Sequence, residues 1–113
     1  MKKLISVAAL LFSFNSNAAW IDASGAVTSL VTYASTETVL VTLSNAGKDT
    51  GCANKVTFAI SKDISSEARA RMYSMLLAAQ STGRSVVVTY NDTGGCEPWD
   101  ANQNAYRKIV RLR

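Results

Sequence analysis

The residues with the clearest chemical potential gather around Trp99, in a polar stretch late in the chain. Sugars bind proteins by placing a C–H face on an aromatic ring while acidic and amide side chains take their hydroxyl groups. Glu97, Asp100 and Asn102 flank Trp99 with such groups. The stretch therefore predicts a glycan-binding loop. The alternative is that Trp99, which follows Pro98, plugs one end of the fold.

A second polar and aromatic cluster lies earlier in the chain, at Tyr33 and Ser35, followed by Thr36 and Glu37. Its residue types suit a sugar in the same way, through a ring and hydroxyl or carboxylate partners. We expect it to lie in the first turn between strands, where the alternative is an ordinary solvated turn.

Enzymatic chemistry has little support in the sequence. The chain contains no histidine, so acid–base catalysis would depend on eight scattered acidic residues, of which Glu97 and Asp100 form the close pair. No nucleophile motif, phosphate-binding glycine loop or metal-ligand spacing occurs. The sequence predicts a binding protein with no cofactor and no metal; the enzymatic alternative is a small hydrolase that uses these two carboxylates.

Residues 1–18 have the pattern of a signal peptide. Lys2 and Lys3 precede the apolar run from Leu4 to Phe14, and small residues up to Ala18 fit the cleavage site. We expect cleavage after Ala18, or one residue later. The run is too short to span a bilayer, so the sequence predicts a secreted or periplasmic protein with no integral membrane segment.

Residues 19–113 suit one small domain with one core. Without Lys2 and Lys3, the twelve basic residues fall to ten against eight acidic ones, a net charge of +2. Nucleic acids demand a dense basic face, so the sequence predicts no nucleic-acid partner.

The two cysteines, Cys52 and Cys96, both lie in this expected domain. Export delivers them to an oxidising compartment, where one disulfide is the simplest prediction. The alternative is a metal or redox site, which the missing histidines and the lack of a CxxC motif disfavour.

One stretch organises the expected fold: a helix from Ser66 to Thr82 that turns directly into a strand. Ser65 or Ser66 can cap its start, and Gly83 can close its end in the left-handed conformation. The following positions form the apolar stripe that should face a core: Ala68, Met72, Met75, Leu76 and Ala79.

Five stretches have the alternating or β-branched composition of strands. They are residues 26–33, 38–43, 55–60, 85–90 and 105–112. In the third, Val56, Phe58 and Ile60 should face inward. With the helix after the third strand, this β-β-β-α-β-β order predicts an α+β, mainly β fold: a five-stranded barrel of the oligonucleotide- and oligosaccharide-binding (OB) type. The alternative is an open α+β sheet with one covering helix.

The chain also resembles the receptor-binding B subunits of AB5 toxins, especially the subtilase-cytotoxin and typhoid-toxin group. The resemblance lies in Trp20 just after the expected cleavage site, in the strand order, in the disulfide and in residues 72–88. That last stretch has a helix bearing Tyr73, a Thr-Gly helix end and a β-branched strand. In that group the cysteines pair between neighbouring strands, whereas Cys52 and Cys96 lie in expected loops.

The resemblance implies a homopentameric ring with helices around a central pore, a glycan or glycoprotein receptor, and a toxin A subunit as a possible partner. On the expected helix, Arg69, Arg71 and Tyr73 are then candidate contacts between subunits; the alternative is a broad core face edged by arginines. The alternative function is a monomeric periplasmic domain that binds or inhibits another protein. The basic residues 107–113 are expected on the wet face of an edge strand.

Overall fold

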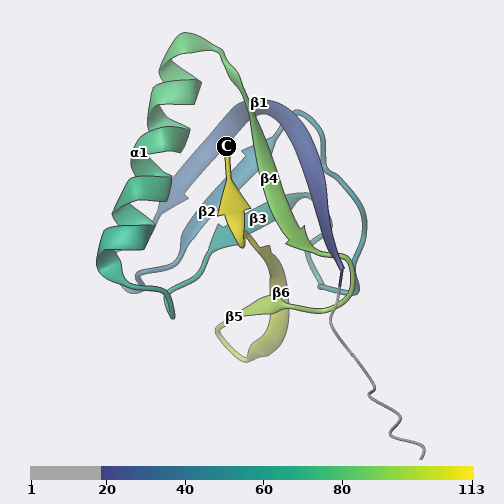
Figure 1. The fold of residues 1–113 in the computed structure, drawn as a ribbon. Coiled ribbons are helices and arrows are strands. Elements are labelled where there is room, and N and C mark those ends of the chain that lie inside the picture. Colours follow the sequence, from purple (N-terminus) through teal and green to yellow (C-terminus); the bar gives the residue numbers. More distant parts are fainter. Residues whose placement is uncertain (1–18) are drawn as a thin grey trace, which may run out of the picture.

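The computed structural model describes residues 19–113, and the expected signal peptide lies outside the described part. One helix and seven strands make a mixed α+β, mostly β fold (Figure 1). The elements are β1 (Trp20–Thr32), β2 (Val39–Leu43), β3 (Thr57–Ile60), α1 (Ser66–Thr82), β4 (Ser85–Asn91), β5 (Cys96–Trp99), β6 (Asn102–Lys108) and β7 (Arg111–Leu112). The sheet order is β5-β6-β3-β2-β1-β4-β7.

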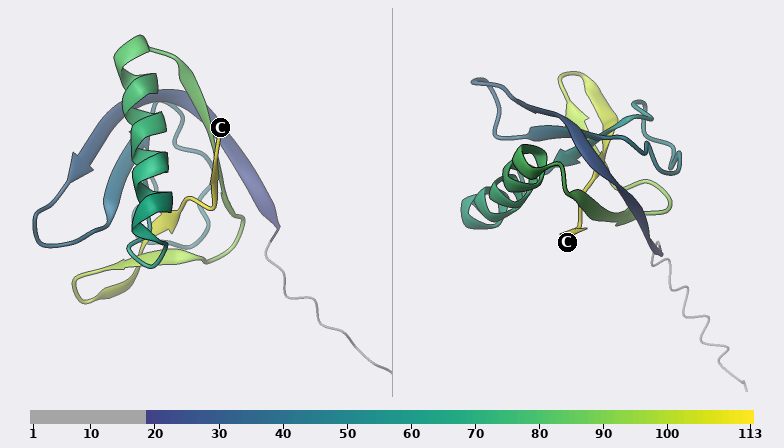
Figure 2. Two further views of the ribbon diagram at one scale, coloured as in Figure 1. Left: turned by 60° about the vertical axis from the view of Figure 1, so that its left-hand side comes forward. Right: turned by 90° about the horizontal axis from the view of Figure 1, so that it is seen from above.

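The long first strand holds the two halves of the sheet together. Its first half pairs with β4, with Ala23 opposite Val88, and its second half pairs with β2. The strand therefore begins at Trp20, before the stretch 26–33 that was expected to form it. The strand bends sharply in Figure 2. Gly25 passes so close to Ser44 that a Cβ at position 25 would lie 2.7 Å from the Ser44 hydroxyl.

The prediction of a five-stranded barrel is wrong. The expected loop around Trp99 contains β5 and the start of β6, which pair as a hairpin, and the expected last strand divides into β6 and β7. The division falls at residues 109 and 110, where the Ile109 N–H donates to Ala59 and the Val110 N–H donates to Thr89. β6 thus runs parallel to β3 while β7 pairs with β4, and the sheet is open, with β5 and β7 at its edges.

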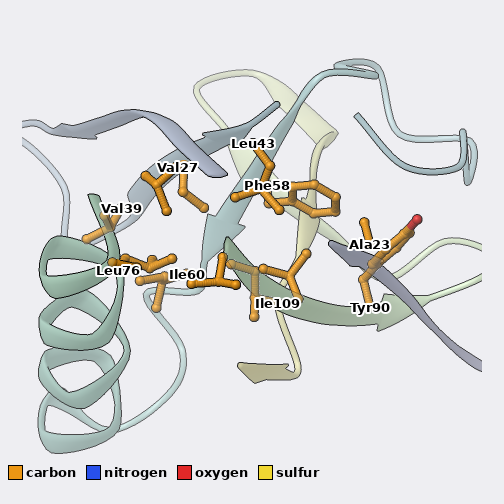
Figure 3. Close-up of a cluster of buried hydrophobic side chains, with 13 residues drawn as sticks. Ala23, Val27, Val39, Leu43, Phe58, Ile60, Leu76, Tyr90 and Ile109 are labelled. Carbon is orange, nitrogen blue, oxygen red and sulfur yellow. The ribbon is translucent and has the colours of Figure 1, made fainter. Parts of the chain in front are cut away.

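The core lies between the curved sheet and α1 (Figure 3). Phe58, Ile60, Val88 and Tyr90 are fully buried in it, with the rings of Phe58 and Tyr90 edge to face at 5.0 Å. Ala59 is also buried, so β3 lacks the expected outward face. Val56, expected inside, lies before β3 and is exposed.

The bounds of the helix are confirmed. The Ser65 hydroxyl accepts from the N–H of Ala68, which satisfies one of the free donors of the first turn. Gly83 closes the other end with a φ of 71°, in the left-handed region that glycine adopts at little cost.

The expected apolar stripe of the helix is only partly correct. Leu76 and Ala79 are fully buried and Met72 packs against the core, but Met75 is 37% exposed. Consecutive helical residues differ by about 100° in direction, so Met75 and Leu76 cannot both point straight at the sheet.

These two neighbours give a matched test of the core. Leu76→Asp is expected to unfold the domain, because a carboxylate without a partner would replace a fully buried side chain. Met75→Asp is expected to lower the free energy of unfolding by no more than about 1–2 kcal/mol. Urea unfolding followed by circular dichroism measures both; equal destabilisation by the two substitutions would contradict this packing.

The disulfide between Cys52 and Cys96 is confirmed. It joins the end of the long 44–52 loop to the first residue of β5. The cross-link therefore anchors the β5–β6 hairpin, and with it Trp99, to the loop between β2 and β3.

The C-terminal strand is held to β1 by charged side chains. The Asp22 carboxylate accepts from the Thr89 hydroxyl, lies 2.8 Å from a guanidinium nitrogen of Arg113 and is 3.9 Å from one of Arg111. The Thr89 hydrogen bond, followed by the charges of the two arginines, holds the pKa of Asp22 below its usual value.

In residues 19–113, no helix has the length and hydrophobicity needed to cross a membrane.

Candidate functional site

The β5–β6 hairpin places Trp99 at its tip. A two-residue turn, Asp100 and Ala101, connects the strands, and Asp100 adopts a φ of 50°, which aspartate tolerates better than most residues. Trp99 and Asn102 face each other across this turn, so their side chains lie close together on one face of the hairpin.

The two clusters expected separately come together around Trp99. The Tyr33 ring lies 5.1 Å from the indole in an edge contact, and the Tyr106 ring makes a second edge contact at 5.7 Å. Tyr33 comes from the turn after β1 and Tyr106 from β6, so the indole is held between two rings from distant parts of the chain. Trp99 stays partly exposed.

Two hollows border the indole. The first hollow, of about 310 Å³, is lined by Ala53, Asn54, Trp99, Asn102, Ala105 and Tyr106. The second hollow, of about 200 Å³, is lined by Ser35, Thr36, Lys62, Pro98, Trp99 and Asp100. Of the expected glycan-binding residues, Trp99, Asp100, Asn102 and Ser35 line these hollows, and Tyr33 contacts Trp99.

The amides in the first hollow are oriented by the backbone. The Asn54 side-chain oxygen accepts from the N–H groups of Val56 and Thr57, at 2.9 and 2.8 Å. The Asn102 oxygen accepts from the N–H of Asn104 at 2.9 Å. Because each oxygen is already engaged, each amide has its NH₂ group left as a donor for a ligand in the first hollow.

Glu97, expected as a sugar ligand, faces the opposite way. Its side chain is fully buried, and its carboxylate accepts from the hydroxyls of Thr38 and Ser61 and from the backbone N–H of Lys62. These bonds, of 2.8 to 3.0 Å, tie β5 to the start of β2 and the end of β3. The carboxylate is therefore a structural group that a solvent-borne ligand does not reach, and the expected acid pair with Asp100 is split.

Substitution of Glu97 tests this structural role. Glu97→Ala is expected to lower the free energy of unfolding by about 3 kcal/mol, because the buried hydroxyls of Thr38 and Ser61 and the N–H of Lys62 lose their acceptor. Glu97→Gln should cost much less, since its amide oxygen still accepts and the two hydroxyls can reorient. Thermal unfolding of both variants measures the difference; an Ala variant as stable as the native protein would contradict the role.

The three helix residues that were expected to contact neighbouring subunits lie in different environments. Arg69 is largely buried: it pairs with Glu37 at 3.1 Å and donates to the carbonyls of Ser61, Lys62 and Ile64. Tyr73 packs against the core, and Arg71 is exposed. Arg71 alone among the three has a side chain directed mainly to solvent.

Arg107, expected on a wet face, is instead 1% exposed. Its guanidinium lies 3.9 Å from the centre of the Phe58 ring and donates to the carbonyls of Ala46 and Lys48. Burial lowers its pKa, which the nearby Tyr90 hydroxyl partly offsets. Within the described residues 19–113, its Nε and Nη2 have no hydrogen-bond partner.

Sequence inspection missed Asn54, Lys62 and Tyr106 as lining residues of the hollows. Tyr106 could have been identified from the sequence, because Asn102, Asn104 and Tyr106 share one face of a strand that begins at residue 102. Asn54 and Lys62 gave no such signal, since only the tertiary fold brings them to Trp99.

Residues 19–113 contain no group of three or more acidic or cysteine side chains placed to hold a metal ion. No protein-family model, curated protein sequence or solved structure matches this chain.

Proposed function

We propose that this protein is an exported, non-catalytic module that binds glycans at Trp99. The observation that carries the proposal is the pair of hollows that meet at the indole, each lined by polar side chains. A sugar ring placed against an indole buries its C–H face, and its hydroxyls then need partners that are already in position. Asn54 and Asn102 supply such donors in the first hollow, while Ser35 and Asp100 supply hydroxyl and carboxylate groups in the second.

A binding role fits the hollows better than hydrolysis. Glu97 is buried and already accepts three hydrogen bonds, so within residues 19–113 Asp100 is the one carboxylate that lines either hollow. Glycoside hydrolysis generally requires two carboxyl groups on opposite sides of the scissile bond.

We further propose that the protein attaches to a glycan or glycoprotein receptor as a homo-oligomer, with a ring of five subunits as the specific expectation. Several weak sugar sites on one assembly would multiply into useful avidity. The exposed Leu77 on α1 and Val31 on β1 are apolar side chains that such an assembly could cover. Light scattering of the oxidised protein tests this: a mass near five times that of the monomer supports the ring, and a monomer contradicts it.

The glycan proposal is tested with Trp99→Ala on a panel of immobilised glycans. Trp20→Ala is the matched control, because Trp20 is 59% exposed and sits at the start of β1 near Arg111. Loss of Trp99 is expected to weaken binding by about 2 kcal/mol or more, about 30-fold in Kd, while Trp20→Ala leaves it unchanged. If the native protein binds no glycan, or if both variants bind equally well, the proposal fails.

A further inference from the structure

A second recessed surface lies on another part of the molecule, between α1 and the C-terminal segment. We call it the helix groove. It comprises two adjoining hollows of about 280 and 440 Å³ that share Ala68, Met72 and Val110. Met75 and Leu112 extend it at one end, and Ile64 and Ile109 at the other. Its lining is therefore mainly apolar, with charged side chains beside the apolar ones.

The groove runs along an open edge of the sheet. β7 is an edge strand, and in Figure 1 it lies between β4 and α1. Arg113 exchanges both backbone hydrogen bonds with Val87, and the next pair, Leu112 and Val88, is the non-hydrogen-bonded kind. The N–H and C=O of Leu112 therefore point away from β4, toward the open edge, and the Leu112 side chain lines the groove.

The rim of the helix groove is positively charged. Arg71, Lys108 and Arg111 line it, and Asp63 is the one acidic residue among the lining residues. Asp22 lies 3.9 Å from Arg111, whereas Arg71 and Lys108 have no ion pair within residues 19–113. A ligand here thus meets an apolar floor, a strand edge and uncompensated positive charge.

We propose that the helix groove binds an extended acidic segment of a partner polypeptide, which adds a strand to β7. The backbone of the segment would pair with Leu112, alternate apolar side chains would enter the groove, and acidic side chains would face Arg71 and Lys108. This pairing uses main-chain hydrogen bonds for affinity and charge for selection of the partner.

A second copy of this chain is a poor occupant for the same groove. The other open edge, β5, carries Pro98, which has no N–H to donate, and the Glu97 side chain there is buried. Residues 19–113, the expected mature chain, carry a net charge of +2, and Lys2 and Lys3 make the segment before them basic. Neither offers the acidic extended strand that the groove fits.

The test uses the oxidised protein and a short capped peptide that alternates valine and glutamate. Binding should shift the amide NMR signal of Leu112 and slow its hydrogen exchange, because that N–H gains an acceptor. The same peptide N-methylated at alternate residues, and a peptide that alternates valine and lysine, should not bind.

Matched charge reversals locate the site. Arg71→Glu combined with Lys108→Glu is expected to weaken peptide binding at least about tenfold. Arg84→Glu, at an exposed position just beyond the end of α1, should leave it unchanged. Circular dichroism of the variants confirms that each remains folded.

Three results would overturn the proposal. They are no binding of the glutamate peptide, binding that survives N-methylation, or a loss of affinity in Arg84→Glu equal to that of the combined Arg71→Glu and Lys108→Glu variant. A protein that self-associates, and that the Arg71→Glu and Lys108→Glu changes convert to a monomer, would assign the groove to a second copy instead. Glycan binding by the same variants should be unaffected, so failure here leaves the Trp99 proposal standing.

Discussion

Removal of the disulfide by Cys52→Ser together with Cys96→Ser is expected to lower the free energy of unfolding by about 4 kcal/mol. The two cysteines are 44 residues apart, and a cross-link across a loop of that length restricts the unfolded chain by about this amount in the chain-entropy model. A domain of this size is generally stable by about 5–15 kcal/mol, so the loss is a large fraction of the total.

Urea unfolding under oxidising conditions measures this loss. The native protein under full reduction is the control and should resemble the double-serine variant, which itself should not respond to reductant. The variant is also expected to bind glycan less well, because the disulfide joins the first residue of β5 to the loop that carries Asn54. Equal stability of native and variant proteins in oxidising buffer would show that the cross-link contributes nothing.

Arg107→Ala is expected to destabilise the domain by about 3–5 kcal/mol, the range seen when a large buried side chain is truncated. The arginine fills the space beside Phe58 and holds the 44–52 loop through the carbonyls of Ala46 and Lys48. Without it, Phe58 and Tyr90 would border a cavity, and the loop would lose its tie to β6.

Arg107→Met separates packing from charge. Methionine fills most of the same volume, and its introduction removes the Nε and Nη2 groups that are buried without partners among residues 19–113. It also removes the two hydrogen bonds to the 44–52 loop, so we expect a loss of about 1–3 kcal/mol in the same urea titration, smaller than that of alanine. If methionine proves as damaging as alanine, the volume of the side chain contributes nothing and the cavity argument is wrong.

Local signals in the sequence were sufficient for the helix and the disulfide. Ser65, Glu67 and Gly83 mark the ends of α1 through capping, charge and left-handed geometry, all of which act within a few residues. Cys52 and Cys96 are the two cysteines of the chain, so each has one possible disulfide partner within it. Such features depend on neighbours in sequence or on elimination, so they need no knowledge of the fold.

The strands were harder to predict because their partners are distant. Residues 22–25 have turn-forming composition, yet they extend β1 because Ala23 pairs with Val88 and Gly25 allows the close approach of Ser44. The residues around Trp99 are polar, yet they form a hairpin that the Cys96 disulfide holds in place. In both stretches tertiary pairing outweighs local propensity.

The candidate site was predictable only in part, because the sequence shows residue types but not which residues meet in the fold. Trp99, Asp100, Asn102, Tyr33 and Ser35 were identified by residue type, and the fold gathers them around one indole. Glu97 was misassigned, and so was Arg107, because nothing nearby in sequence reveals a buried polar partner. The hydroxyls that satisfy Glu97 lie 36 and 59 residues away.

The most direct test of glycan binding at Trp99 is an NMR titration of the oxidised protein with the best ligand from the glycan panel. The expected mature chain contains two tryptophans, Trp20 and Trp99, so two indole N–H signals report on two separate places. We predict that the Trp99 signal shifts in proportion to the bound fraction, together with the side-chain amide signals of Asn54 and Asn102, while the Trp20 signal stays fixed. A shift of Trp20 alone, or binding that leaves the Trp99 signal unchanged, would contradict the site.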